Sequence, residues 1–231
     1  MVNVDTVYQR VLALTNKEQR GYVTPLEFNL LANQAQFDIF EQYFYDINQL
    51  ALTDDIGAEY SDSVDTIKEK ISFFESSGVT ITGGTLPLDL YRLGTVIHTN
   101  TLGENEVEYV EKDRLLHILK SPLARPTMSR PVYIRSGNLI TVYGGSTGGI
   151  VGSNISCNYI KRPIPAQWGY NIIMEKALYN SGMSTNFELH QSEETKLVIK
   201  ILELAGILIN KPGLVTIASQ KEANKTQQEK A

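Results

Sequence analysis

The longest helical pattern in the sequence runs from Thr24 to Leu50, and it limits the possible folds more than any other stretch. It begins with a capping box, in which Thr24 is the N-cap, Pro25 takes the first helical position and Glu27 reaches back to the cap. Apolar residues then recur at spacings of three, four and seven, which is the helical period: Leu26, Leu30, Leu31, Phe37, Phe40, Phe44 and Ile47. We therefore predict one long helix over residues 24–50.

A second set of apolar residues widens the surface of this helix beyond one stripe: Phe28, Ile39, Tyr43 and Leu50. A helix with such a broad apolar surface is contacted on more than one side. Two interpretations stay open, a core helix and nothing more, or a core helix whose second side meets a neighbouring subunit. Under the second interpretation Phe28, Ile39 and Tyr43 are candidate interface residues.

Other helical patterns lie near both ends of the chain. Asp5 or Thr6 can cap a first helix, and residues 63–74 have the spacing of a third. Near the C-terminus Ser192 is placed to cap a helix that ends at Gly206. This last helix and the one at 24–50 cannot bury their apolar stripes alone, so we predict that they pack together.

Between these helices the period changes to that of strands. The predicted strands are Val79–Thr82, Thr95–Thr99, Val107–Val110, Val132–Arg135, Asn138–Tyr143 and Asn154–Lys161. Pro163 and Pro165 end this part, because proline cannot donate to a sheet ladder. Residues 187–190 alternate like a further strand, and 175–180 fit either a strand or a helical turn.

These patterns predict an α+β fold, with a helical body formed from the N- and C-terminal helices and an inserted antiparallel β-sandwich or barrel-like region. The predicted parts are an N-terminal helical part (1–77), a β-rich region (78–165), a C-terminal strand and helix (166–213) and a polar tail (214–231).

Two further segments are candidate contact sites. The glycine-rich stretch after residue 143 lacks the lysine of a phosphate-binding loop, so it is predicted to be a long hairpin loop. Its candidate contact residues, with a neighbouring chain or with a lumen, are Gly144, Gly145, Gly148 and Gly149. The tail starts with a short apolar segment, Leu214, Val215 and Ile217, that suits strand addition or groove binding on a partner.

Catalytic chemistry has no support in the sequence. His98, His117 and His190 have no other His or Cys at ligand spacing, and nothing around Cys157, the single cysteine, would activate its thiol. We expect no catalytic residue, no cofactor and no metal, and hence no enzyme. One cysteine excludes an internal disulfide and suggests a reducing compartment.

The formal net charge of −5 argues against a general nucleic-acid binder. No apolar run has the length of a membrane span, and the N-terminus lacks the pattern of a secretory signal. Synthesis in the cytoplasm is the expectation.

Several segments together resemble structural proteins of tailed bacteriophages, in particular the head-to-tail connector or ring proteins of crAss-like and related short-tailed phages. The resemblance is carried by residues 8–12, 16–29, 123–127, 130–133, 159–163 and 187–206, including Leu123-Ala-Arg-Pro-Thr and Tyr159-Ile-Lys-Arg-Pro. The glycine-rich hairpin and the residues after Gly213 lie outside it.

The resemblance implies a virion protein of the neck or tail, made in the host cytoplasm. It implies a homo-oligomeric ring, usually of twelve copies, that stacks on the portal protein or on other connector or tail proteins, with no membrane involved. DNA would pass through the ring without specific binding, which an acidic chain favours because nonspecific affinity comes largely from phosphate contacts. The alternative is a monomeric or weakly associating capsid- or tail-binding module.

Overall fold

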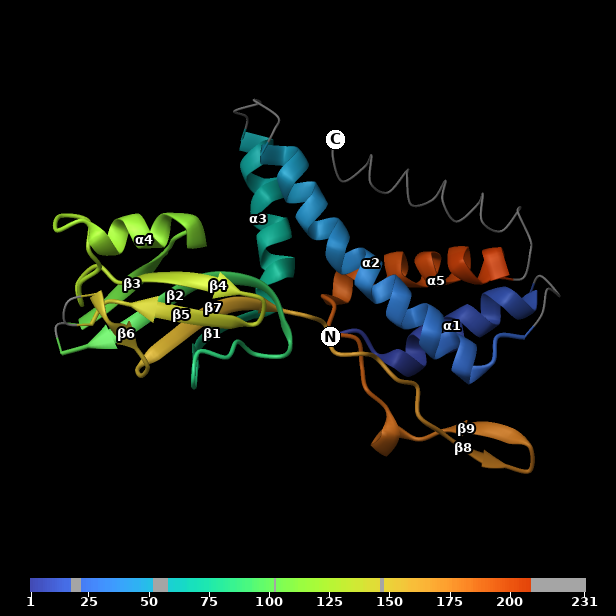
Figure 1. Cartoon of the computed structure of the whole chain (residues 1–231). Helices are drawn as coiled ribbons and strands as arrows, with labels where there is room; N and C mark the ends of the chain where they lie inside the picture. Colours follow the sequence, from blue (N-terminus) through green and yellow to red (C-terminus); the bar gives the residue numbers. More distant parts are fainter. Residues whose placement is uncertain (18–21, 52–57, 102, 146–147, 209–231) are drawn as a thin grey trace. The chain divides into compact units, whose positions relative to one another are not determined.

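The computed structural model describes residues 1–17, 22–51, 58–101, 103–145 and 148–208 (Figure 1). The fold is mixed α+β, with five α-helices and a large mixed β-sheet among these residues. The chain divides into two compact units, which we call unit 1 (Met1–Phe73 and Pro163–Ala231) and unit 2 (Phe74–Arg162). Unit 1 therefore joins segments from both ends of the chain.

Four helices belong to unit 1: α1 (Val4–Lys17), α2 (Pro25–Ala51), α3 (Ala58–Ser72) and α5 (Glu194–Leu208). The long helix α2 contacts α3 and α5, and α5 also contacts α1. The predicted packing of the 24–50 helix against the C-terminal helix is thus confirmed. Gly206 does not stop α5, which continues to Leu208.

Helix capping follows the sequence at α2 but not at α1. The Thr24 N–H donates to Glu27 Oε2 (2.9 Å) and the Glu27 N–H donates to Thr24 Oγ1 (3.3 Å), so the predicted capping box is present. In α1 the side chain of Asn3 accepts from the N–H groups of Asp5 (2.8 Å) and Thr6 (3.2 Å). Asn3 is the cap in place of the predicted Asp5 or Thr6, because the helix starts earlier to bury Val4.

The buried face of α2 includes Phe40 and Phe44 of the predicted core stripe, together with the second set of apolar residues. Phe28, Ile39 and Tyr43 are buried inside this chain, at 0%, 1% and 3% exposure, whereas Leu26 and Leu30 are 66% and 67% exposed. The buried face also contains the small residues Ala32 and Ala35 at helical spacing. An apolar pattern that weighs only large side chains misses such a face, because alanines add little to the pattern although they allow close packing.

The segments before α5 also differ from expectation. Phe187 makes one isolated bridge to Val2 where residues 187–190 were predicted to form a strand. The short 3-10 helix η3 (Gln191–Glu193) follows, with His190 as its N-cap, so Ser192 is not the cap of α5.

Unit 2 contains a seven-stranded sheet of order β1-β7-β2-β3-β4-β5-β6. Its strands are β1 (Glu75–Thr80), β2 (Leu90–Asn100), β3 (Gly103–Tyr109), β4 (Val132–Ser136), β5 (Leu139–Tyr143), β6 (Ile150–Val151) and β7 (Ile155–Lys161). All neighbours pair antiparallel except β3 and β4, which are parallel. The helix α4 (Lys112–Lys120) lies in the connection between β3 and β4, as a parallel crossover requires.

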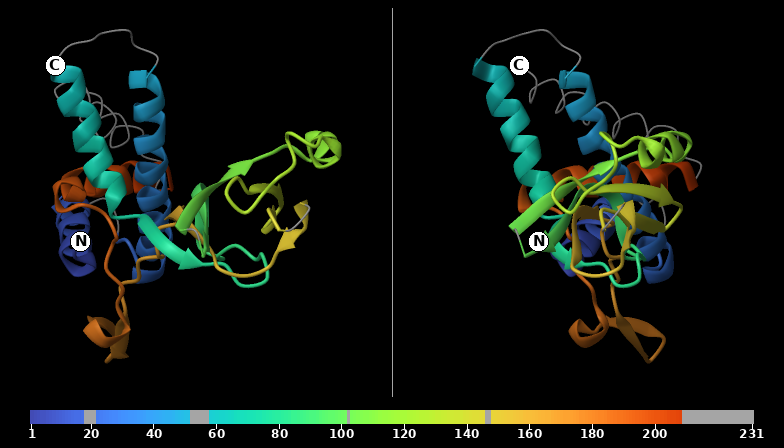
Figure 2. Two further views of the ribbon diagram at one scale, coloured as in Figure 1. Left: turned by 90° about the vertical axis from the view of Figure 1, so that its left-hand side faces the viewer. Right: turned by 60° about the vertical axis from the view of Figure 1, so that its left-hand side comes forward.

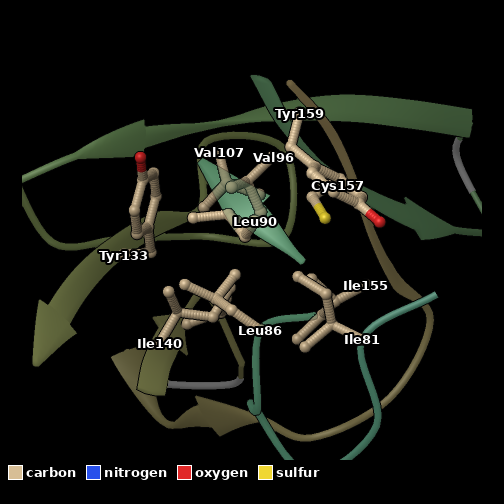
Figure 3. Packing of buried hydrophobic residues seen from close by; sticks show 11 residues of the cluster. Ile81, Leu86, Leu90, Val96, Val107, Tyr133, Ile140, Ile155, Cys157 and Tyr159 are labelled. Atoms are coloured by element: carbon tan, nitrogen blue, oxygen red, sulfur yellow. The ribbon is translucent and has the colours of Figure 1, made fainter. Parts of the chain in front are cut away.

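The predicted sandwich or barrel is not confirmed, because β1 and β6 end the strand order without pairing and the described sheet is not closed. One face of the sheet packs the main core of unit 2 around Val96, Val107 and Cys157 (Figure 3). On the other face α4 places Leu115 against Val110 and Val132.

Candidate interaction surface

An extended segment, residues 164–168, lies along α2 and positions the part of unit 1 that follows it. Three amide side chains of α2 hold it. Gln36 donates to the Ile164 carbonyl (2.8 Å), Asn33 donates to the Ala166 carbonyl (3.0 Å), and Asn29 accepts from the Trp168 N–H (2.8 Å) and donates to its carbonyl (3.3 Å). Side chains at i, i+4 and i+7 of the helix thereby satisfy alternate residues of an extended backbone.

Trp168 anchors the end of this segment. Its indole is buried and donates from Nε1 to the Asp5 carboxylate (2.9 Å). The ring lies against Tyr8, Tyr170 and Tyr179, with centroid distances of 4.4, 5.7 and 5.8 Å. Burial raises the pKa of the Tyr8 phenol, so it remains a neutral donor, bonded to the Val23 carbonyl. The anchor is therefore both packed and hydrogen-bonded.

After Trp168 the chain forms a separate two-stranded sheet, β8 (Tyr170–Ile173) and β9 (Lys176–Tyr179), followed by the 3-10 helix η2 (Ser181–Met183). We call residues 170–183 the arm. The segment 175–180, left undecided between strand and helical turn, thus contains a strand. The arm extends away from α1, α2 and α5 in both views of Figure 2.

The base of the arm is tight. Gln167 and Thr185 exchange two backbone hydrogen bonds, of 3.0 and 2.8 Å. A Cβ on Gly169 would lie 2.6 Å from the backbone of Met183, closer than side-chain carbons approach backbone atoms. The two ends of the arm can meet at this point only because residue 169 is glycine.

The surface of the arm is apolar and uncovered. Its exposed apolar residues are Ile172 (72%), Ile173, Met174 (92%), Leu178, Tyr179 and Met183. They lie on both faces of the hairpin, because residues 172 and 173 point to opposite sides of a strand. A lone two-stranded hairpin is marginally stable in water, and clustered exposed apolar side chains mark interaction sites.

The turn of the arm adds strain at its tip. Met174 and Glu175 have φ values of 50° and 62°, the left-handed region. A two-residue hairpin turn of type I′ has positive φ at both central positions, and Asn-Gly is its usual sequence. Met174, which is 92% exposed, makes this turn less favourable than Asn-Gly would, and it places an apolar side chain at the tip of the arm.

The other predicted contact residues lie elsewhere. Gly144 and Gly148 are buried by their own chain. A Cβ on Gly144 would lie 2.9 Å from Pro131, and Gly148 has φ +78°. The N–H groups of Gly144 and Gly145 both donate to the Gly149 carbonyl (3.0 Å each). Hydrogen bonds and packing within the chain therefore shape the described part of this loop.

Leu214, Val215 and Ile217 lie outside the described residues. Phe28, Ile39 and Tyr43, as described above, belong to the core of unit 1. The arm was not predicted from the sequence, although one signal was present: Ile172-Ile-Met-Glu-Lys-Ala-Leu contains two short apolar runs around a charged pair, without a glycine to mark the turn.

Groups with catalytic potential are dispersed or buried. Among the residues that the structure describes, no group of three or more His, Cys, Asp or Glu side chains could hold a metal ion. Cys157 is fully buried, and burial raises the pKa of its thiol, with Asp89 adding to the shift. Of the three histidines, His98 is buried, His117 is exposed and His190 caps η3.

The structure has two open hollows of note. One, of about 470 Å³, is in unit 2 and includes Glu106, Glu108, Tyr109 and Tyr133 in its lining. The other, of about 560 Å³, lies at the base of the arm and includes Gly169, Ile172 and Met183. Neither lining brings a nucleophile together with a base.

Among the helices that the structure describes, none combines the length and apolar composition needed to cross a bilayer. Comparison with known protein families finds no family that matches this chain, and no curated protein matches it.

Proposed function

We propose that the protein is a structural component of a bacteriophage virion, a ring-forming head-to-tail connector. It would stack on the portal or on a neighbouring ring around the DNA channel. The resemblance of the segments quoted above supplies the class of protein. The observation that carries the proposal is the arm, residues 170–183, because it is tied firmly at its base and exposes apolar side chains on both faces.

A surface of this kind favours permanent assembly. The hairpin cannot bury its own six apolar side chains. Binding a partner that covers them is favoured by roughly 25 cal/mol per Å² of apolar area buried. In a ring each copy offers its arm to one neighbour and receives an arm from the other, which covers every arm.

The protein acts in this role without catalysis, cofactor or metal. Its formal net charge of −5 suits a wall past which DNA slides, since a basic wall would hold the phosphates.

The test is the mass of the purified protein and of its complex with the portal, by light scattering. The native chain is expected to form a ring near twelve times its 25.8 kDa mass, or to form one when the portal is added. The triple variant Ile172→Ser, Met174→Ser, Leu178→Ser is expected to stay monomeric with an unchanged melting temperature, because these side chains are exposed in the isolated chain.

A matched control is Leu88→Ser in unit 2, which changes a residue that is 94% exposed and should leave ring formation intact. A native chain that stays monomeric with the portal, yet binds capsid or tail proteins through the arm, is instead the weakly associating module. Rings that form equally well with the arm variant would remove the observation on which the proposal rests.

A further inference from the structure

Two consecutive stretches of unit 2 carry opposite charge. Residues 103–111 contain four glutamates and neither lysine nor arginine. Residues 112–130 contain five lysines and arginines and one aspartate. In a chain of formal net charge −5 the second stretch is a local excess of positive charge.

The negative charges form a row on β3. Glu104, Glu106 and Glu108 alternate with inward residues such as the buried Val107, so they share one face of the sheet, and all three are exposed. Neither an ion pair nor a side-chain hydrogen bond joins them to any residue that the structure describes. Their neighbours on β2, Ile97 and Thr99, carry no charge. The row, which we call the acidic row, is therefore uncompensated.

The positive charges lie on α4. Lys112, Arg114 and Lys120 are exposed, while Leu115 is the buried contact of the helix. These three cations make no ion pair with the described residues, and Leu116 stands between them at 64% exposure. We call the solvent-exposed side of α4, which carries these three cations and also the exposed Asp113, the basic face of α4.

The arginines after the helix have a different role. Arg125 donates to the Leu119 carbonyl (3.2 Å) and Arg130 donates to the Leu123 carbonyl (3.5 Å). They hold the loop that follows α4, so the cations available to a partner are those of the basic face.

The two surfaces belong to the same face of the sheet. Glu108 on β3 is in register with Val132 on β4, and α4 packs on Val132. Within one copy the structure nevertheless has no ion pair between the acidic row and the basic face. Both surfaces are therefore open to a partner of opposite charge.

The acidic row also borders a hollow. Glu106 and Glu108, with Tyr109 and Tyr133, line the open space of about 470 Å³ described above. The rings of Tyr109 and Tyr133 share the sheet face of Val107, whereas the carboxylates of the acidic row share the opposite face, so contact with the row is argued from its charge alone.

We propose that the basic face of α4 in one copy, Lys112, Arg114 and Lys120, docks on the acidic row of β3, Glu104, Glu106 and Glu108, in a second copy. This inference rests on the association of copies proposed above and adds which surfaces meet. A second copy is favoured over DNA because it neutralises both surfaces, whereas a phosphate backbone would meet the basic face and be repelled by the neighbouring glutamates.

The experiment uses three full-length variants. In the first, the three glutamates of the row become lysine. In the second, Lys112, Arg114 and Lys120 become glutamate. The third combines both sets of changes and therefore keeps the formal net charge of −5. Self-association of each, and of the first two mixed, is measured by sedimentation velocity at about 50 and about 500 mM salt, where screening differs strongly.

The native chain is expected to associate at least about tenfold more weakly at the higher salt. Each single-set variant loses association, because its two surfaces then carry the same sign. The mixture of the two regains it, and so does the combined variant. The combined variant is the matched control, since it carries all the substitutions without changing net charge.

Other outcomes overturn the inference. If association depends neither on salt nor on either set of changes, the contact lies elsewhere on the protein. The ring proposal would still hold in that case, provided that the arm variant abolishes association. If the native chain and the mixture of variants both remain monomeric, the proposed contact is also excluded. Assembly on the portal then tests the ring proposal separately. If the native chain binds duplex DNA and only the second variant loses this binding, with no change in self-association, the basic face is a DNA-binding surface.

Discussion

The extended segment 164–168 and the arm that follows it are neighbours in sequence but opposite in surroundings. The segment has its backbone hydrogen-bonded by three amides of α2, and Trp168 is buried at its end. Two residues later Tyr170 begins a hairpin in which almost every apolar side chain faces solvent.

This difference teaches how a small protein can present an apolar surface without losing its fold. The anchored segment depends on contacts within the chain, so changes there should lower stability. The arm has few such contacts, so changes there should alter assembly and leave stability almost untouched.

The largest effect is expected for Phe40→Ala in α2. Phe40 is fully buried and its ring lies 5.1 Å from that of Phe44, edge to face. Removing the ring leaves a cavity and should lower the free energy of unfolding by roughly 3–5 kcal/mol. Chemical denaturation measures it, with Ile172→Ala in the arm as the matched control, for which we expect less than about 0.5 kcal/mol. A loss below about 1 kcal/mol for Phe40→Ala would mean that the side chain is not part of the core.

A somewhat smaller loss is expected for Lys70→Met. The Lys70 ammonium lies 2.7 Å from the Glu193 carboxylate, which is only 2% exposed. Removing the cation leaves a buried unpaired charge, which typically costs about 3 kcal/mol or more. The double variant Lys70→Met, Glu193→Met should recover much of the loss in a denaturation experiment. Equal stability of native and single variant would contradict the buried pair.

Gly169→Ala tests the boundary between the anchored segment and the arm. The new Cβ would meet the Met183 backbone at 2.6 Å, so the base of the arm must open, at about 1–3 kcal/mol. Hydrogen exchange should show faster exchange at Gln167 and Thr185 while α2 is unchanged. Gly152→Ala in unit 2, where nothing lies within 4 Å, is the control and should have no effect.

The smallest effect concerns the capping box of α2. The hydrogen bond from the Thr24 N–H, and next that from its hydroxyl, holds the pKa of the Glu27 carboxyl below its usual value of 4.5. A depressed folded-state pKa stabilises the protein above the unfolded pKa, and the contribution disappears as pH falls below about 4.5. Glu27→Gln should therefore flatten the pH dependence of the melting temperature below pH 4.5. An unchanged profile would exclude this role.

Much of the secondary structure was predictable because its signals are local. The capping box at Thr24, the helical period of α2 and the strand alternation near Val132 and Ile155 each depend on residues within a few positions of one another. At α1 three nearby residues could serve as the N-cap, namely Asn3, Asp5 and Thr6. The cap was predicted at Asp5 or Thr6, a few residues after the actual cap, Asn3.

The candidate surface was harder to predict because burial is not local. Leu26 and Leu30 have the spacing of a core stripe, but the partners of α2 pack on the face of Phe28, Ala32 and Ala35. The arm was missed because its turn uses Met174 and Glu175 rather than glycine or asparagine, so no local signal separated its strands.

The sequence alone was enough to predict the long helix α2, most strands of unit 2, the absence of a clustered ligand pattern around its histidines and single cysteine, and the opposite charges of residues 103–111 and 112–130. Only the tertiary structure decided which face of α2 is buried, that Asn29, Asn33 and Gln36 hold an extended segment, and that the arm stays uncovered. The reason is that hydrogen-bonded turns and caps join residues close in sequence. Burial instead depends on segments such as 29–36 and 164–168, which are separated by more than a hundred residues and are brought together only by the fold.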